Sequence, residues 1–200
     1  MNLASVLGPA PCASCGRRGA WLCAPCLQAA RPASLGRRPA NVDRVVARWA
    51  YEGGPRALLL RLKLHHLAGA AEPLVAGMVT AARTAGLDAD LVTWVPARSR
   101  DISARGFDQA EVLARGLARR LGLPVAAALI RRGMQRDQSG LDRTLRMENL
   151  RGAFQAVGRV PDRVILIDDL ITTGATADAC ATALKAGGSS HVTLLTPCAV

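Results

Sequence analysis

The 200-residue sequence predicts an α/β protein with a doubly wound, mostly parallel sheet, preceded by a small module rich in cysteine. Three observations lead to this prediction. Short apolar runs alternate with helical patterns over residues 44–200, the order expected of strands joined by helical crossovers. The run at residues 164–167 is aliphatic at every position, as in a strand covered on both faces. Four cysteines lie within residues 1–30, and a linker rich in Pro, Gly and Arg follows at residues 31–43.

Composition sets limits on the class of protein. Hydrophobic residues make up 50% of the chain and aromatic residues only 3%, so the core is built mainly from Ala, Leu and Val. No signal peptide is indicated, and no run approaches the roughly 18 apolar residues of a membrane span. We therefore expect a soluble, cytoplasmic protein without membrane insertion. The net charge of +11 favours polyanionic partners such as nucleic acid, although a solvated basic face would explain it equally.

The amino-terminal cysteines form two C-x-x-C pairs with a short spacer. Two such turns can direct four thiolates at one point and complete a tetrahedral zinc site. Disulfides or a redox dithiol are the alternatives, but an intracellular setting disfavours disulfides, and the βα context of a thioredoxin motif is absent. Because four thiolates leave no open coordination position, the zinc is expected to be structural. The predicted ligands are Cys12, Cys15, Cys23 and Cys26.

The first half of the main domain predicts two strands and two helices. Residues 45–51 are apolar with β-branched character, which favours a strand, and residues 56–67 have the pattern of a short helix. Residues 72–85 predict a second helix, and Gly86 marks its end. The apolar run at residues 91–95 predicts the second strand.

The second half continues the alternation. Residues 109–121 predict an amphipathic helix, with Gly122 at the position after its last turn. Four apolar runs predict further strands, and one Ala-rich stretch predicts the last helix. The strands cover residues 125–130, 153–157, 163–167 and 192–196, and the helix covers residues 175–186.

The segment from residue 164 to residue 176 carries the strongest candidate site. Asp168 and Asp169 follow the buried strand, at the edge where open α/β sheets bind ligands, and can accept hydrogen bonds from sugar hydroxyls or help hold hydrated Mg²⁺. The next residues offer hydroxyls and a helix amino terminus, which favours an anion such as phosphate. An ordinary Thr-capped helix after solvated acids is the alternative. The loop residues are Thr172, Thr173, Gly174, Ala175 and Thr176.

This segment resembles the 5-phosphoribosyl-1-pyrophosphate (PRPP) motif of the type I phosphoribosyltransferases, in which an apolar strand leads into two acids and a Thr-Thr-Gly-x-Thr loop. The resemblance implies a type I phosphoribosyltransferase fold over residues 44–200. It also implies that Asp168 and Asp169 face the ribose hydroxyls, as catalytic residues, while residues 172–176 wrap the 5′-phosphate. Mg²⁺ is expected to bind together with PRPP.

Two more stretches extend the resemblance to the ComF family, phosphoribosyltransferase-like proteins linked to competence and DNA uptake in natural transformation. One is R-G-F-D-Q at residues 105–109, where Asp108 replaces the Asn usual in that family. An acid there can cap the helix but would oppose a pyrophosphate. The other has the order Gln138, Arg143, Arg146, Asn149 and Phe154.

Arginines near the site are candidates for binding the leaving group. Arg98 and Arg100 follow the strand at residues 91–95, and an arginine fork suits phosphate oxygens, although both could be solvated surface residues. The polar segment at residues 131–151 suits a lid that brings Arg143 and Arg146 to the site. Alternatively, these two arginines support the loop or contact DNA.

Two functions are therefore expected to compete. One is a phosphoribosyltransferase, a glycosyltransferase that uses PRPP and Mg²⁺ with an acceptor that the sequence does not reveal. The other is a non-catalytic adaptor that binds single-stranded DNA or the competence helicase through the zinc module and the basic surface. A Gly-rich dinucleotide fingerprint and a P-loop are both absent from the sequence, which disfavours NAD-dependent and ATPase functions.

Overall fold

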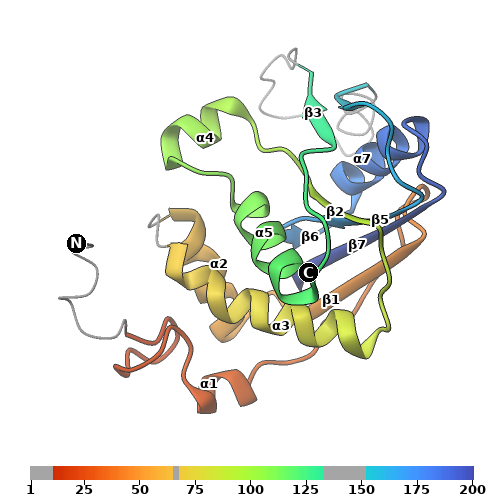
Figure 1. Ribbon diagram of the computed structural model, residues 1–200. Coiled ribbons are helices and arrows are strands. Elements are labelled where there is room, and N and C mark those ends of the chain that lie inside the picture. Colours follow the sequence, from red (N-terminus) through yellow and green to blue (C-terminus); the bar gives the residue numbers. More distant parts are fainter. Residues whose placement is uncertain (1–10, 65–67, 133–151) are drawn as a thin grey trace.

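The central sheet of the computed structural model is parallel throughout, and helices cover both of its faces (Figure 1). The structure describes residues 11–64, 68–132 and 152–200. The four main strands lie in the order β1-β7-β5-β2, and a short strand, β6, pairs with the end of β7. This confirms the predicted doubly wound α/β class. The strands are β1 (Arg44–Ala50), β2 (Leu91–Trp94), β5 (Arg163–Ile167), β6 (Leu170–Ile171) and β7 (His191–Ala199).

Alternating residues of each strand pack into two separate apolar layers. In β5, Ile165 and Ile167 face the layer formed with α2 (Gly53–Leu64), α3 (Ala71–Thr84) and α5 (Gln109–Leu121). Val164 and Leu166 face the opposite layer, formed with α7 (Ala175–Ala186). All four side chains are buried, which explains why this strand is aliphatic at every position.

The predicted helices match closely where the sequence carries end signals. The boundaries of α5 and α7 are the predicted ones, and Gly122 has the left-handed conformation that ends α5. Helix α2 begins three residues before the prediction, and residues 65–67 lie outside the described residues. Within the described residues, no helix is both long and apolar enough to cross a membrane.

The strands predicted at residues 125–130 and 153–157 do not extend the central sheet. Val125 makes one parallel bridge to Val92 of β2, and the chain then leaves the sheet edge. Strand β3 (Leu129–Arg131) pairs antiparallel with β4 (Phe154–Ala156) in a separate two-stranded sheet that packs near α7. The strand predicted at residues 153–157 is thus confirmed as β4, whereas only residues 129–130 of the run at 125–130 lie in a strand.

Short elements were not predicted. They are α1 (Ala24–Gln28), the 3-10 helix η2 (Ala68–Ala70), α4 (Ser99–Arg105) and β6. Each has at most seven residues, so none shows a clear hydrophobic period in the sequence. Two of them matter for the site, because α4 follows β2 and β6 follows the two acids.

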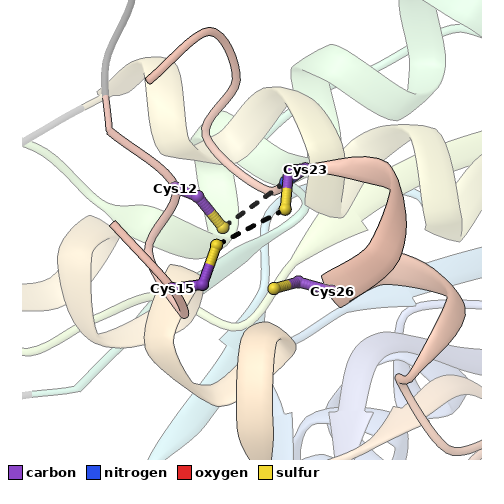
Figure 2. A group of neighbouring side chains, drawn as sticks. All are labelled: Cys12, Cys15, Cys23 and Cys26. Carbon is purple, nitrogen blue, oxygen red and sulfur yellow. Dashed lines mark hydrogen bonds between the residues drawn. The ribbon is translucent and has the colours of Figure 1, made fainter. Parts of the chain in front are cut away.

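The amino-terminal unit, whose four cysteines are drawn in Figure 2, packs onto the main domain. Cys12, Leu22 and Cys23 are buried in the same apolar layer as Trp49 and Leu58. The segment expected to be a linker also contacts the sheet, since the amide of Ala33 donates to the carbonyl of Arg48 at 3.3 Å and Pro32 bridges to Trp49. Residues 31–33 therefore run along the edge of β1.

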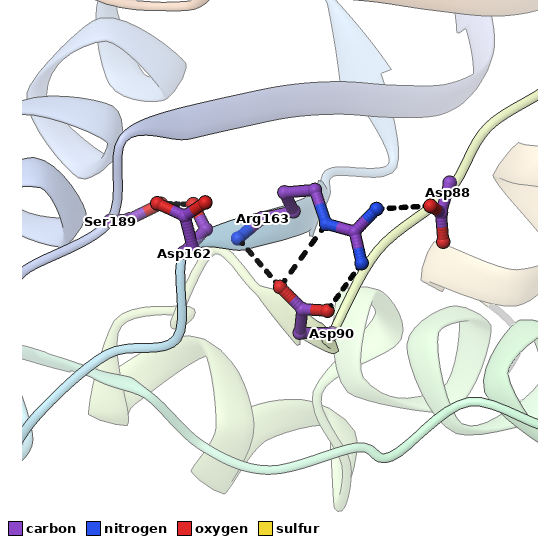
Figure 3. A network of polar contacts seen from close by, with 5 residues as sticks. All are labelled: Asp88, Asp90, Asp162, Arg163 and Ser189. Atoms are coloured by element: carbon purple, nitrogen blue, oxygen red, sulfur yellow. Dashed lines mark hydrogen bonds and ion pairs between the residues drawn. The ribbon is translucent and has the colours of Figure 1, made fainter.

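The amino ends of β2 and β5 are joined by a polar network (Figure 3). The guanidinium of Arg163 binds Asp90, with Nη2 2.7 Å from Oδ1, and also binds Asp88. The backbone amide of Arg163 donates to the other oxygen of Asp90 at 3.0 Å. Hydrogen bonds from Arg163 lower the pKa of Asp90, so the ionised carboxylate is stabilised at this end of the sheet.

Candidate functional site

The opposite end of β5 carries the two predicted acids, and each meets different neighbours. Asp169 forms an ion pair with Lys63 of α2, with Oδ2 2.7 Å from Nζ. Lys63 also acts on Asp168, whose charge in turn acts on Arg131 of β3 and Cys180 of α7. The amide of Asp169 donates to Oδ1 of Asp168 at 2.8 Å and ties the two residues together.

The pKa of Asp168 lies above its ordinary value. Burial raises the pKa of Asp168 to about 8, and the neighbouring charge of Asp169 adds to the shift, while Lys63 opposes it. The ammonium of Lys63 is paired with the carboxylate of Asp169. Lys63 was not predicted as a site residue, although it is one of only two lysines in the chain, the other being Lys185.

The loop after β6 presents its hydroxyls to solvent. Thr172 and Thr173 are both exposed, and Gly174 has a φ of 75° immediately before the amino terminus of α7. A side chain at residue 174 would be strained by this φ, and its Cβ would lie 2.4 Å from Pro39. Glycine is therefore required for this loop to lie against the segment that contains Pro39. The structure thus brings the predicted hydroxyls to the start of a helix.

A pocket of about 440 Å³ lies beside this loop. Its wall includes Arg37 and Arg38, which the sequence analysis assigned to a linker. The segment is held in place because Asn41 donates to Asp178 of α7, from its amide at 2.7 Å and from its side chain at 3.0 Å. The pocket combines two cations and two hydroxyls with apolar side chains. Its lining residues are Leu35, Gly36, Arg37, Arg38, Val45, Ile171, Thr172, Thr173, Ala199 and Val200.

The loop after β2 is anchored by Asp108. This buried carboxylate caps α5 through the amides of Ala110 at 2.9 Å and Glu111 at 3.4 Å, as predicted for the acid at this position. Its other oxygen accepts from the amide of Ala97 at 2.9 Å. Burial nonetheless raises the pKa of Asp108, against these hydrogen bonds. Asp108 therefore holds the loop in place with both of its oxygens.

The two arginines predicted in this loop take different positions. Arg98 stands immediately before α4, and its charge acts on Arg131 near the acids. Arg100 is exposed on α4, where its Nε lies 3.9 Å from Oδ1 of Asp101. The predicted lid residues, Arg143 and Arg146, lie outside the described residues, as do Gln138 and Asn149.

Arg131 is the second residue near the acids that the sequence analysis missed as a site residue. It belongs to β3, and its guanidinium lies over the ring of Phe154, with Cζ 4.5 Å from the ring centroid. Burial lowers the pKa of Arg131, and the positive charge of Arg98 lowers it further. No sequence feature distinguishes Arg131 as a site residue, because many other arginines lie near it in the chain.

The four cysteine sulfurs form one cluster, in which all lie within 4.8 Å of one another. The sulfurs of Cys15 and Cys23 are 3.6 Å apart, and the amide of Cys23 donates to the sulfur of Cys12 at 3.4 Å (Figure 2). Tetrahedral zinc with Zn–S bonds near 2.3 Å places neighbouring sulfurs roughly 3.8 Å apart. The spacing of the cluster is compatible with structural zinc.

Known proteins resemble this chain mainly at the level of solved structures. No protein-family model and no curated protein matches it. The chain is similar to the glutamine PRPP amidotransferase from B. subtilis complexed with ADP and GMP, with 26% identity, a TM-score of 0.42, and coverage of 62% of this chain and 25% of that one. The allosteric regulatory enzyme of purine biosynthesis gives 26% identity, a TM-score of 0.42, and coverage of 63% and 25%. Adenine phosphoribosyltransferase from Leishmania tarentolae has 20% identity and a TM-score of 0.36, and the match covers 62% of this chain and 54% of that one. The match thus spans about a quarter of the first two chains.

Proposed function

We propose that this protein binds PRPP with Mg²⁺ and acts as a phosphoribosyltransferase. The observation that carries the proposal is the order of groups at the carboxyl end of β5: two acids, two exposed hydroxyls that line a cationic pocket, and the amino terminus of α7. PRPP has a matching order, with a phosphate at one end, ribose hydroxyls in the middle and a pyrophosphate at the other end.

The loop at residues 172–176 suits the 5′-phosphate. Thr172 and Thr173 offer hydroxyl donors, and the free amides at the start of α7 favour an anion. Arg37 and Arg38 line the pocket beside this loop and add positive charge. The loop is predicted from the sequence as the phosphate-binding segment, and the pocket lining adds Arg37 and Arg38 to it.

The acids suit the ribose and the metal. Asp168 and Asp169 offer carboxylate oxygens to the ribose hydroxyls, and such oxygens are the ligands that Mg²⁺ prefers. The metal bound with PRPP would neutralise charge on the departing pyrophosphate. Lys63 keeps Asp169 in place until the ligand arrives.

In the reaction, a nucleophile of the acceptor forms a bond to C1 of the ribose while the bond from C1 to the pyrophosphate oxygen breaks. The electron pair of that bond leaves with pyrophosphate, and the acceptor loses a proton to solvent or to a nearby base. The protein contributes mainly by positioning the two reactants and by stabilising charge.

Calorimetry with PRPP and Mg²⁺, followed by a pyrophosphate-release assay with bases, amines and ammonia, tests the proposal. We expect the wild-type protein to bind PRPP and one acceptor to release pyrophosphate. The variant Asp168→Asn/Asp169→Asn should lose both, whereas Asp88→Asn at the other end of the sheet serves as a matched control. Absence of PRPP binding by the wild type would refute the proposal.

The ComF-like sequence pattern supports a finer proposal, a role in competence and DNA uptake. The exposed arginines Arg17 and Arg18 on the cysteine unit and the net charge of +11 suit a polyanion. They also support the rival function, an adaptor that binds single-stranded DNA or the competence helicase without catalysis.

Transformation assays separate these two functions. In a transformable strain that lacks the protein, an active transferase requires both acids, so Asp168→Asn/Asp169→Asn should fail to restore transformation. The adaptor predicts normal transformation by that variant, together with salt-dependent binding of single-stranded DNA that Arg17→Gln/Arg18→Gln weakens. No DNA binding at low ionic strength would exclude the nucleic-acid form of the adaptor.

We also propose that the cysteine cluster holds structural zinc. Metal analysis of freshly purified protein should give about one zinc per chain, the stoichiometry of a four-thiolate site. Cys15→Ser should release the zinc and lower the melting temperature, because Cys12 and Cys23 pack into the main core. Cys180→Ser serves as a control for loss of a thiol outside the cluster. Zinc retained by Cys15→Ser would contradict the assignment.

A further inference from the structure

The cysteine unit, residues 11–30, lies against one side of α2. In the first turn of α2, Gly54 leaves no room for a side chain, because its Cβ would lie 2.6 Å from Cδ1 of the buried Leu22. In the last turn, Nη1 of Arg61 donates to the carbonyl of Pro11 at 2.7 Å, immediately before the first cysteine. The unit therefore contacts α2 near both of its ends.

The other side of α2 reaches the candidate site through Lys63, whose Nζ lies 2.7 Å from Oδ2 of Asp169. An α-helix turns by roughly 100° per residue, so Gly54 and Arg61 lie on one side of α2 and Lys63 lies roughly opposite them. The side chains of Lys63 and Asp169 are only 25% and 17% exposed, so solvent screens this ion pair less than a surface pair. Helix α2 thus connects the cysteine unit to the acids.

The cysteine unit also contacts the segment that follows α2. A Cβ on Gly69 of η2 would lie 2.8 Å from Cζ2 of Trp21. Within residues 11–30 the only helix is α1, with five residues, so metal–thiolate bonds rather than secondary structure would fix the spacing of Pro11, Trp21 and Leu22. A change in that spacing moves the contacts of α2, and the ammonium of Lys63 moves with its helix.

We propose that the cysteine unit positions Lys63 for the candidate site: Leu22 and Arg61 hold α2 so that Lys63 orients Asp169, and the metal content of the cluster thereby tunes PRPP·Mg²⁺ affinity. Leu22 and Arg61 act through Lys63 and are positioning residues. The inference rests on the proposed function for the identity of the ligand, but the ion pair itself can be observed without any ligand.

NMR of protein with isotope-labelled lysine tests the ion pair, because Lys63 and Lys185 are the only lysines in the chain. Asp169→Asn marks the position of the Lys63 side-chain signal when the pair is broken. We expect zinc removal with a chelator, or Leu22→Ala, to move the Lys63 signal towards that position. The signal of Lys185, whose Nζ lies 2.9 Å from Oδ1 of Asp43, should stay in place as an internal control.

Calorimetry with PRPP and Mg²⁺ measures the effect on binding. Leu22→Ala should weaken binding by about 5- to 10-fold, the lower range of couplings between separate sites. In a Lys63→Met background the same change should alter the affinity less than about twofold, because the effect passes through Lys63. By reciprocity, PRPP·Mg²⁺ should raise the affinity for zinc, measured by chelator competition, by the same factor by which zinc raises the affinity for PRPP·Mg²⁺.

Matched variants separate the contact from a folding defect. Leu27→Ala removes an exposed leucine of the same unit and should leave the Lys63 signal and the PRPP·Mg²⁺ affinity unchanged. Leu22→Met keeps most of the buried volume and should retain most of both. Because Leu22→Ala leaves all four cysteines in place, it tests the contact separately from the metal. Arg61→Gln should resemble Leu22→Ala, since it removes the donor to Pro11.

The outcomes separate the two proposals. A Lys63 signal that stays fixed both on zinc removal and in Leu22→Ala overturns the positioning role. An equal loss of PRPP·Mg²⁺ affinity from Leu22→Ala in the wild-type and Lys63→Met backgrounds overturns it as well. A Lys63 signal that responds to zinc and to Leu22→Ala, in a protein that does not bind PRPP, supports the positioning role and refutes the phosphoribosyltransferase function.

Discussion

The two ends of strand β5 use charge in opposite ways. At the amino end, Arg163 binds Asp90 and Asp88, and its hydrogen bonds lower the pKa of Asp90. At the carboxyl end, burial raises the pKa of Asp168 to about 8, with help from Asp169. The amino end pairs its two acids with one guanidinium, whereas the carboxyl end places two acids next to each other in the chain and pairs one of them, Asp169, with Lys63.

This contrast distinguishes a structural network from a candidate ligand site. A network that is already neutralised gains little from binding an ion, since a ligand would have to replace existing partners. Crowded like charges are relieved when a ligand of the right charge arrives, so they favour binding. The same strand therefore carries a neutralised network at one end and the candidate site at the other.

The largest expected effect comes from removing a carboxylate at the carboxyl end. Asp169→Asn should weaken PRPP·Mg²⁺ binding by about 100-fold or more, because a carboxylate that faces metal and ribose hydroxyls is lost. Asp90→Asn, the matched change at the amino end, should alter that affinity less than about twofold. Equal losses in the two variants, measured by calorimetry, would show that the ends do not differ.

A pH titration gives the next largest effect. Because Asp168 must lose its proton to act as a carboxylate, PRPP·Mg²⁺ affinity should rise by about tenfold per pH unit below pH 8 and level off above it. In Asp168→Asn this rise in affinity below pH 8 should disappear, while the pH dependence caused by titration of the ligand phosphate remains. A wild-type profile that is identical to that of Asp168→Asn would contradict the proposed ionisation.

Lys63 should have a smaller effect, seen as a shift of this profile. The cation of Lys63 lowers the pKa of Asp168 in part, so Lys63→Met should move the midpoint of PRPP·Mg²⁺ binding upward by about one pH unit. Lys185→Met removes the only other lysine and its ion pair with Asp43, and it should leave the midpoint in place. A midpoint that stays fixed in Lys63→Met would exclude a role of Lys63 in the charge balance.

The smallest effect concerns stability, and its sign differs between the two ends. Since the pKa of Asp90 is lowered on folding, its contribution is present above the usual Asp pKa near 3.8 and is lost as pH falls below it. The pKa of Asp168 is raised, so its contribution is present at low pH and is lost as pH rises from about 4 to 8.

Urea unfolding across this pH range measures both contributions. Arg163→Gln should lower the urea midpoint slightly at pH 7 and less at pH 3, with PRPP binding unchanged, because this ion pair is partly exposed. Asp168→Asn should flatten the decline of stability between pH 5 and pH 8. A larger loss for Arg163→Gln at pH 3 than at pH 7 would reverse the expected sign.

Local signals in the sequence predicted most elements and the centre of the site. The boundaries of α5 and α7 were correct because a cap or a glycine marks the end of each helix pattern, as with Asp108 and Gly122. The acids and the threonine loop were found because they are contiguous with a buried strand. The strand at residues 125–130 was misplaced, since membership in a sheet depends on a partner elsewhere in the chain.

Other members of the candidate site lie far from the acids in sequence. Lys63 reaches Asp169 from α2, and Arg131 reaches the site from β3. Arg37 and Arg38 looked like part of a linker until the structure showed them beside Thr172 and Thr173. No pattern of spacing relates these positions, because the fold alone brings them to one edge of the sheet.

The sequence by itself determined the α/β class, the four-cysteine cluster and the acid–threonine segment, because periodicity, C-x-x-C spacing and a contiguous motif are local properties. Only the tertiary structure decided which cations meet that segment. Burial and the approach of distant residues set the pKa of Asp168 and the position of Arg131. These are properties of packing, since charge interactions depend on distance in space rather than on separation along the chain.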